Sequence, residues 1–326
     1  MTILCFGEML IRLAPATDAG LAETEMLKVE VAGAEANVAI SLSSFGTPTR
    51  MATVVPDNAL GRRALRTLGS WKVDARYCLT RKGRMGLYFI GSPRDGREGD
   101  FFYDRAASAF ACNATAIDWN AALHDVDWLH ISGLTAALGD VAVSAMRNAI
   151  GTARAKGAAI SFDCNFRPQL WEGRRDEART LFREFANAAT LVFANEWDAQ
   201  LILGDEVGQQ DSMTMLGALP STRWIASTVR TFNESGSNLG AVLSSRHGTT
   251  EVCATTITPF VERIGAGDAF AAALLHALAS GWDDEVSLRF AHRACLMKHS
   301  RRGDYSTFSA EDVLQAVADA PPTSAH

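Results

Sequence analysis

The chain has 326 residues, of which 48% are hydrophobic and 21% charged, and its formal net charge is -6 at pH 7. This composition indicates a globular protein with a sizeable core, and the scattered lysines and arginines argue against a nucleic-acid-binding surface. No apolar run reaches the ~18 residues that a membrane-spanning helix needs, and no basic stretch typical of a signal peptide opens the chain. We therefore expect a cytoplasmic protein that binds neither nucleic acid nor membranes. The six cysteines lie far apart without a CxxC pair, which predicts free thiols.

The first third of the chain predicts two kinds of structure. The segments 3–8 and 49–55 predict buried strands, and a helix that stops at a glycine is expected between them over 33–46. Residues 72–105 differ, because short β-prone pieces alternate there with the turn signals RKGR and RDGREG. This pattern is typical of hairpins and predicts a small sheet apart from the main body.

From residue 118 onward, strands and helices alternate. The expected strands lie at 126–132, 158–165, 190–195, 223–229 and 240–245. The expected helices lie at 140–157, with Asp140 as the N-cap, at 174–189 and at 196–204, and three more helical stretches end the chain. This alternation predicts a single α/β domain whose mostly parallel sheet is covered by helices on both faces.

Polar side chains gather where these strands end. The stretches DCNFRP (163–168), NE (195–196) and STVR (227–230) each follow or end a strand, and IGAGD (264–268) ends a further β-like piece. In open α/β sheets, ligands bind beyond the carboxyl ends of the strands. The pattern therefore predicts a functional site at this edge of the sheet.

The stretch GAGD at 265–268 is the main candidate for chemistry. Gly265 and Gly267 permit a sharp turn and a close approach of the backbone to a ligand. Unpaired N–H groups and the helix dipole favour an anion such as phosphate at a helix start, and they should keep Asp268 ionised at neutral pH. Such a carboxylate can accept a proton from a hydroxyl, or it can simply cap the helix. Phe270 breaks a G-x-G-x-x-G pattern, and no Walker A lysine follows.

Two stretches carry a resemblance to a known family. AGAEANVAISLSSFG (32–46) and ERIGAGDAFAAALLHAL (262–278) together resemble the two signatures of the ribokinase-like (PfkB) carbohydrate kinases. The resemblance covers nearly the whole chain. It implies a three-layer α/β fold with a central, mostly parallel sheet and a small β-sheet lid built from segments at about 10–35 and 72–105. Other stretches are similar to the branch of this family that acts on 2-keto-3-deoxygluconate, namely GEMLIRLAP (7–15), YDRAASA (103–109), DCNFRPQLW (163–171), NEWDAQLI (195–202) and KHSRRGD (298–304).

The resemblance implies phosphoryl transfer from ATP to a hydroxyl of a sugar acid. Asp268 would be the general base. The backbone amides that would stabilise the transferring phosphoryl group are those of Gly265, Ala266 and Gly267. Closure of the lid would exclude water, and pairing of exposed lid strands would give a homodimer.

The family resemblance also implies that the nucleotide and Mg²⁺ bind at the strand ends. The resemblance implies that Asn165 and Asn195 contact the nucleotide and that Glu196 positions Mg²⁺, although Asn195 can also be the N-cap of the helix that follows it. The run STVRTFNESGSNLG (227–240) would be a variant nucleotide loop in which Ser227 and Arg230 touch phosphates. A requirement for a monovalent cation such as K⁺ stays open.

The sugar would be held by residues of both signatures and of the lid. The implied substrate-binding residues are Gly33, Asn37, Tyr88, Tyr103, Arg105, Arg167 and Asp304. A buried amide at Asn37 needs partners, which a sugar hydroxyl or the backbone could supply. Arg105 and Arg167 suit a carboxylate because the guanidinium fork matches it, although a charge in a hairpin is usually solvated.

The sequence also departs from the family pattern. Pro56 stands where the first signature usually ends with glycine, Glu262 where an aspartate is usual, and Arg230 where a glycine is expected. The alternatives are a kinase of this family for a neutral sugar such as fructose or ribose, and a non-catalytic sugar-binding sensor. A nicotinamide-dependent oxidoreductase is disfavoured because no G-x-G-x-x-G follows the first strand.

Overall fold

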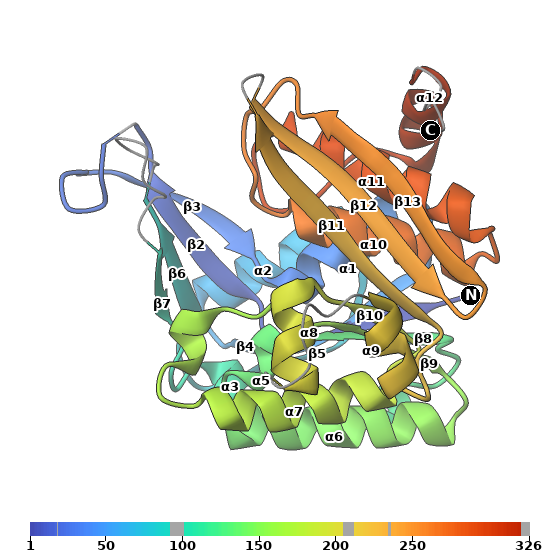
Figure 1. The fold of residues 1–326 in the computed structure, drawn as a ribbon. Helices are drawn as coiled ribbons and strands as arrows, with labels where there is room; N and C mark the ends of the chain where they lie inside the picture. Colours follow the sequence, from blue (N-terminus) through green and yellow to red (C-terminus); the bar gives the residue numbers. More distant parts are fainter. Residues whose placement is uncertain (18, 92–100, 205–211, 234–235, 321–326) are drawn as a thin grey trace.

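The computed structural model describes residues 1–17, 19–91, 101–204, 212–233 and 236–320. Its framework is a nine-stranded sheet in the order β13-β12-β11-β10-β9-β8-β1-β4-β5, with a separate four-stranded sheet, β3-β2-β6-β7, projecting beside it (Figure 1). The expected fold class, a mostly parallel central sheet with a small second sheet, is confirmed. Among the described residues, no helix combines the length and the apolar character needed to cross a membrane.

The central sheet is parallel from β5 to β11 and antiparallel across its last three strands. Its strands are β1 (Ile3–Phe6), β4 (Thr49–Pro56), β5 (Asp74–Arg81), β8 (Trp128–Ser132), β9 (Ala159–Asp163), β10 (Leu191–Phe193), β11 (Trp224–Asn233), β12 (Gly236–Ser245) and β13 (Gly248–Thr256). The strands of the small sheet are β2 (Leu10–Pro15), β3 (Leu27–Ala32), β6 (Gly86–Ile90) and β7 (Phe101–Asp104).

Helices cover both faces of the central sheet, as Figure 1 shows. One apolar core lies between the sheet and a first set of helices, which are α1 (Ala34–Ser44), α2 (Ala59–Ser70), α10 (Ala266–Ala279), α11 (Asp284–His299) and α12 (Ala310–Ala318). The other core lies between the sheet and a second set, which are α3 (Ala109–Asn113), α4 (Trp119–Ala122), α5 (Gly133–Ala136), α6 (Asp140–Ala155), α7 (Arg175–Ala188), α8 (Glu196–Leu203) and α9 (Ser212–Ala218). Strands such as β1 and β8 are buried along their whole length because both faces are covered.

The structure differs from the sequence-based expectations at several elements. β5, inside the segment 72–105 expected to form the lid, pairs in parallel with β4 and belongs to the central sheet. The helix after residue 139 is not capped by Asp140, which is its first helical residue and follows the N-cap Gly139. The stretch 227–240, expected to be a loop, forms a hairpin of β11 and β12 around residues 234–235, which lie outside the described residues. β13 ends at Thr256, so GAGD follows a connecting segment rather than a strand.

Candidate active site

The GAGD turn forms the N-terminus of α10, where Gly265 is the N-cap. Gly265 has a φ of +70°, and a Cβ on it would overlap the backbone carbonyl of Asp304, so a larger residue does not fit. Gly267 is exposed and has open space where a Cβ would lie. The N–H of Ala266 donates to the carbonyl oxygen of Arg263 at 3.2 Å. The three amides expected to hold an anion are therefore not equivalent, and Gly267 offers the more open approach to the first-turn N–H groups.

Asp268 lies in the first turn of α10 and contacts α1. Its Oδ2 accepts a hydrogen bond of 2.7 Å from Nδ2 of Asn37. Burial raises the pKa of Asp268 to about 7, and the hydrogen bond from Asn37 and the positive charge of Arg167 offset this only in part. Burial thus works against the expected ionisation of Asp268 at neutral pH. A pKa close to neutral pH suits a group that takes up and returns a proton.

Asn37 presents an unsatisfied acceptor beside that carboxylate. Its side chain is only 5% exposed, and its Oδ1 has no hydrogen-bond partner among the described residues. A buried acceptor without a donor is costly, so a donor from a ligand or from water is needed there. Gly33 sets the start of α1 with a φ of +145°, and a Cβ on it would come 2.5 Å from the carbonyl oxygen of Glu8. This close packing fixes where Asn37 points.

A second carboxylate, Asp163, ends β9 on the same side of the sheet. Burial and the negative charges of Asp268 and Asp198 raise the pKa of Asp163 to about 8, while the charge of Arg167 opposes the rise. The backbone N–H of Asn165, a residue with a φ of +40°, donates to Oδ1 of Asp163 at 3.0 Å. Three carboxylates from β9, α8 and α10 thus share one electrostatic neighbourhood, and Arg167 is a cation facing all three.

Buried ion pairs connect the small sheet to the main body. Nε of Arg105 donates to Oε2 of Glu8 at 2.6 Å, and both side chains are buried. Nε of Arg12 on β2 donates to both oxygens of Asp304 at 3.1 and 2.9 Å. Arg105 is therefore not a solvated hairpin charge, and the Asp304 carboxylate is already paired. Sequence reasoning missed Glu8 and Arg12 as individual residues, although both lie in the stretch GEMLIRLAP.

Two tyrosines line the inner side of the small sheet. The rings of Tyr88 on β6 and Tyr103 on β7 stack with centroids 5.1 Å apart and planes 13° apart. Burial raises the pKa of Tyr88, with Asp304 contributing in the same direction and Arg12 and Arg167 opposing it. The hydroxyl of Tyr88 is therefore neutral, and Arg167, which follows β9, is close enough for its charge to act on it.

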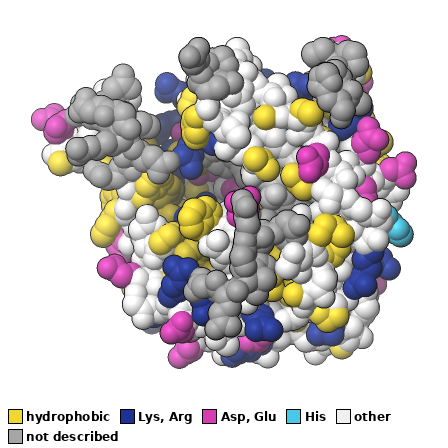
Figure 2. All heavy atoms as spheres, in the orientation of Figure 1, with side chains coloured by type: hydrophobic (Ala, Val, Ile, Leu, Met, Phe, Trp, Pro, Cys, Tyr) yellow, Lys and Arg dark blue, Asp and Glu magenta, His cyan; other side chains and the backbone are white. Residues whose placement is uncertain are grey.

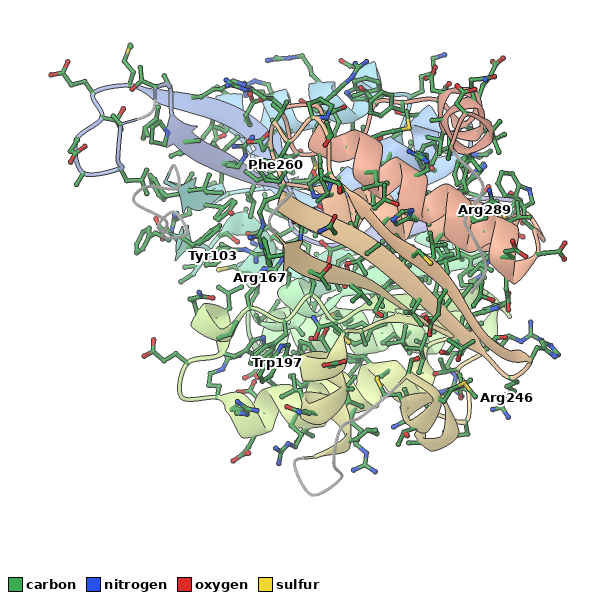
Figure 3. All side chains as sticks on the ribbon, turned by 45° about the horizontal axis from the view of Figure 1, so that its top comes forward. Tyr103, Arg167, Trp197, Arg246, Phe260 and Arg289 are labelled. Atoms are coloured by element: carbon green, nitrogen blue, oxygen red, sulfur yellow. The ribbon has the colours of Figure 1, made fainter. Side chains whose placement is uncertain are left out.

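Two of the side chains that the sequence singles out, Tyr103 and Arg167, lie toward one end of the molecule. Figure 3 shows Tyr103, Arg167 and Phe260 toward the same side, whereas Arg246 and Arg289 lie at the other end. In the space-filling view, this face is hollowed between the small sheet and the β11–β12 hairpin, with acidic and basic side chains beside the hollow (Figure 2). The geometry thus brings together the start of α10, the start of α1, the end of β9 and the small sheet.

Comparison with known proteins identifies the family. The family profile described as "pfkB family carbohydrate kinase" matches residues 2–310. The chain belongs to the pfkB family. A 2-dehydro-3-deoxygalactonokinase of Haloferax volcanii is 28% identical over 97% of this chain and 96% of its own length. Fructokinase-1 of Zea mays is 28% identical over 98% of each chain.

A solved structure agrees with this assignment over nearly the full length. The crystal structure of a 2-dehydro-3-deoxygluconokinase from Thermotoga maritima matches with a TM-score of 0.87 at 28% identity, covering 98% of this chain and 99% of that one. The pfkB kinase described here is therefore an enzyme, a phosphotransferase acting on a carbohydrate. Similarity to both sugar-acid kinases and fructokinases leaves its substrate to be argued from the site.

Two of the predicted nucleotide contacts of this pfkB kinase, Ser227 and Arg230, lie on β11. Arg230 donates from Nη1 to Oγ of Ser237 at 2.9 Å and pairs through Nη2 with Nε2 of His299 at 2.8 Å. Burial lowers the pKa of His299 to about 4, so its ring is neutral and Nε2 accepts from Arg230. Nδ1 of His299 then donates to the carbonyl oxygen of Cys295 at 2.8 Å. Ser227, three residues earlier on the same strand, is half-buried.

The expected Mg²⁺ site is at the start of α8. Asn195 caps this helix, because its Oδ1 accepts from the N–H groups of Trp197 and Asp198, and Asp198 accepts in return from the N–H of Asn195 at 3.0 Å. The capping role considered for Asn195 is thus confirmed. Glu196 is exposed in the first turn. No group of three or more metal-ligating side chains occurs in the described part of the chain. Mg²⁺ usually takes one or two carboxylates plus phosphate oxygens, so an exposed Glu196 fits such a site.

Proposed function

We propose that this pfkB kinase transfers the γ-phosphoryl group of ATP to a hydroxyl of a 2-keto-3-deoxy sugar acid, with 2-keto-3-deoxygluconate giving its 6-phosphate. The observation that carries the proposal is the partly buried Asp268, hydrogen-bonded to Asn37 at the N-terminus of α10. The relatives from Haloferax volcanii and Thermotoga maritima are named as kinases of 2-dehydro-3-deoxy sugar acids, which supports the substrate class. In these names, "dehydro" denotes the same oxo group as "keto".

In this proposal, each group at the site has a defined task. Asp268 accepts the proton of the attacking hydroxyl, and Asn37 holds the carboxylate in place while its Oδ1 accepts from a sugar hydroxyl. The first-turn amides at Gly265 and Gly267 and the α10 dipole stabilise negative charge on the transferring group. Glu196 and phosphate oxygens would hold Mg²⁺, which neutralises phosphate charge.

Arg167 is the proposed carboxylate-binding residue of the sugar-acid site. Its side chain is exposed at the carboxyl end of β9, and its charge acts on Asp163, Asp268 and Tyr88. Nε of Arg105, in contrast, is paired with Glu8, so we propose that Arg105 acts mainly by fixing the end of β7 to the connection between β1 and β2. Tyr88 and Tyr103 then offer hydroxyl groups from the inner side of the lid.

The substitution Asp268→Asn tests the proposal. Loss of the general base should lower kcat about 10²–10⁴-fold, while ATP binding is retained. The measurement is coupled ADP release over a panel of keto-deoxy sugar acids and neutral sugars, with nucleotide binding by calorimetry. Asp140→Asn is the matched control, because Asp140 is an exposed aspartate in the first turn of another helix. Unchanged turnover in Asp268→Asn would remove Asp268 from the chemistry.

A neutral sugar is the second candidate substrate, because the chain is also similar to a fructokinase. The same panel separates the two, since a neutral ketose has no carboxylate for Arg167 to bind. Turnover of any sugar would also exclude a non-catalytic sensor.

We further propose that the chain is a single kinase domain in which the small sheet is a lid. The same sheet would form the interface of a homodimer. Its edge strands β3 and β7 carry exposed apolar side chains, including Leu27 and Phe102. Exposed edges readily pair with a second chain, so sedimentation should detect a homodimer.

A further inference from the structure

We propose that Glu35 is a positioning residue of this kinase, whose buried carboxyl group ties the first turn of α1 to the ends of β1 and β8 and so holds Asn37 against Asp268. The inference rests on the proposed function, because Asp268 is the proposed base. Glu35 acts through Asn37 and not by contact with a substrate.

Glu35 is an acidic residue in an almost fully enclosed position. It is 1% exposed, although it lies in the first turn of a helix. Its Oε1 accepts hydrogen bonds from Oγ of Ser132 at 2.7 Å and from Oγ1 of Thr135 at 2.8 Å. Ser132 ends β8 and Thr135 lies in α5, so both bonds join α1 to the same turn. A buried carboxyl group needs such donors, and they fix its position.

The carboxyl group of Glu35 also fills the space beside Gly7, the residue that follows β1. A Cβ on Gly7 would overlap Cδ and both oxygens of that carboxyl group. Gly7 is not one of the glycines with a positive φ, so its backbone conformation does not require glycine. The close approach of Glu35 does require it. The end of β1 is therefore a second point at which Glu35 holds α1 to the sheet.

The turn that donates to Glu35 is itself closely packed. Ser132 is paired in register with Asp163 at the end of β9. A Cβ on Gly133 would overlap the carbonyl oxygen of Cys164, so this turn cannot shift without moving the segment that follows β9. Glu35 thus fixes the start of α1 relative to the ends of β1, β8 and β9.

The position of Asn37 depends on this attachment. The N-cap of α1, Gly33, supplies no capping side chain, and Glu35 and Asn37 lie in the first turns that follow it. Residues two positions apart in one helix move together. Nδ2 of Asn37 donates to Asp268 at 2.7 Å, and a shift of about 1 Å at the helix start would break this hydrogen bond.

A double-mutant cycle with Asn37 tests whether Glu35 acts through it. Glu35→Ala should lower kcat roughly 10- to 100-fold, because misplacement by about 1 Å costs up to about 10²-fold. The KM for the sugar acid should rise, since Asn37 is proposed to accept from a sugar hydroxyl, and the KM for ATP should not change. In the Asn37→Ala background, Glu35→Ala should cost less than about twofold in kcat.

Two further variants separate positioning from general damage. Glu35→Gln should keep most of the wild-type kcat, because its amide oxygen can still accept from both hydroxyls. Thr222→Val is the matched control for lost stability. Oγ1 of the buried Thr222 donates to the carbonyl oxygens of Ala186 and Ala189 at 3.4 and 3.1 Å, before β11 and at the amino ends of the parallel strands. It should lower the melting temperature without lowering kcat.

These measurements can overturn the inference in three ways. The first is a Glu35→Ala variant with wild-type kcat. The second is a loss of kcat that is as large in the Asn37→Ala background as in the wild type. The third is a Glu35→Gln variant that loses as much kcat as Glu35→Ala, because the two hydroxyl contacts would then not explain the effect.

A second cycle needs no substrate. Gly7→Ala should lower the melting temperature of the wild type, because the new methyl group displaces the Glu35 carboxyl group. In the Glu35→Ala background, Gly7→Ala should lower the melting temperature much less, because the methyl group enters the vacated space. Additive shifts would overturn the inference. A wild-type protein that phosphorylates no sugar would overturn the proposed function alone, because the melting cycle would still decide whether Glu35 holds α1 to the end of β1.

Discussion

At the scale of single residues, the site depends on how one carboxyl group is held. Asp268 accepts a hydrogen bond from the amide of Asn37. It also lies near a second buried carboxyl group, Asp163, whose pKa burial raises to about 8. The positive charge of Arg167 lowers the pKa of both aspartates and so partly offsets the effect of burial. The same guanidinium is proposed to bind the substrate carboxylate, so one side chain controls both recognition and proton affinity.

Replacement of Arg167 by alanine should therefore discriminate between substrates. We expect Arg167→Ala to raise the KM for a keto-deoxy sugar acid roughly 10- to 100-fold, because a charged hydrogen bond is worth about 1.5–3 kcal/mol. The KM for a neutral ketose should change little. Steady-state kinetics on both substrates measure this. Equal effects on the two would exclude Arg167 from carboxylate binding.

The pH dependence follows from the pKa of Asp268. If Asp268 is the base, its deprotonated form is the active one. Burial raises the pKa of Asp268 in the free enzyme to about 7, so kcat/KM should then rise as pH increases through about 7 and level off. Arg167 lowers that pKa, so Arg167→Ala should move the rise to higher pH. A pH–rate profile for each protein tests both statements. A rise centred near the ordinary aspartate range would show that the carboxyl group is solvated when it acts.

At the scale of elements, the start of α10 combines rigidity with access. A Cβ on Gly265 would overlap the backbone of Asp304, whereas a Cβ on Gly267 would meet open space. Gly265→Ala should cost about 1–3 kcal/mol of unfolding free energy, because a Cβ in this left-handed conformation also overlaps the carbonyl of Asp304. Gly267→Ala should change stability by no more than about 1 kcal/mol, in the favourable direction, because alanine suits a helix.

The two glycine variants should also differ in how turnover relates to stability. If phosphate reaches the first-turn amides through the open space beside Gly267, Gly267→Ala should lose turnover while it keeps its stability, because the methyl group would occupy that space. Chemical denaturation and ADP release on the same samples provide both numbers. Full activity in a stable Gly267→Ala would place the phosphate elsewhere.

The elements of the fold differ in how readily the sequence predicts them. Buried parallel strands and amphipathic helices such as α7 follow from local pattern. GAGD points to the candidate site because glycines and a carboxylate at a helix start are informative by themselves. β5 resembles a lid hairpin because it is amphipathic, and only its pairing with β4 decides its sheet. Arg105 and Asp304 looked available for substrate because their partners Glu8 and Arg12 are 97 and 292 positions away. Such ion pairs, and the pKa of Asp268, depend on long-range packing that local pattern does not encode.

At the scale of the whole molecule, the small sheet and the central sheet face each other across the site. The Arg12–Asp304 and Arg105–Glu8 pairs hold the proposed lid to the main body, and Arg63 on α2 also donates to the carbonyl oxygen of Val29 on β3 at 2.6 Å. A sheet attached in this way can close over a bound sugar while its far end moves.

Hydrogen exchange measures that closure. Binding of sugar acid and a nonhydrolysable ATP analogue should slow amide exchange in 86–90 and 101–104, because closing the lid shields β6 and β7 from solvent. Strand β5, which belongs to the central sheet, is the internal control and should not change. Equal protection of all three strands, or of none, would argue against a closing lid.

The hydrogen bond between Asn37 and Asp268 joins two side chains 231 positions apart in the chain. During synthesis on the ribosome, α1 is therefore made long before its partner helix exists. If Asp268 is the base, a nascent chain has most of its sheet yet cannot turn over ATP until α10 has emerged and docked. Products of interrupted translation would then be catalytically silent, and they would expose the apolar face of α1 that α10 covers in the finished enzyme.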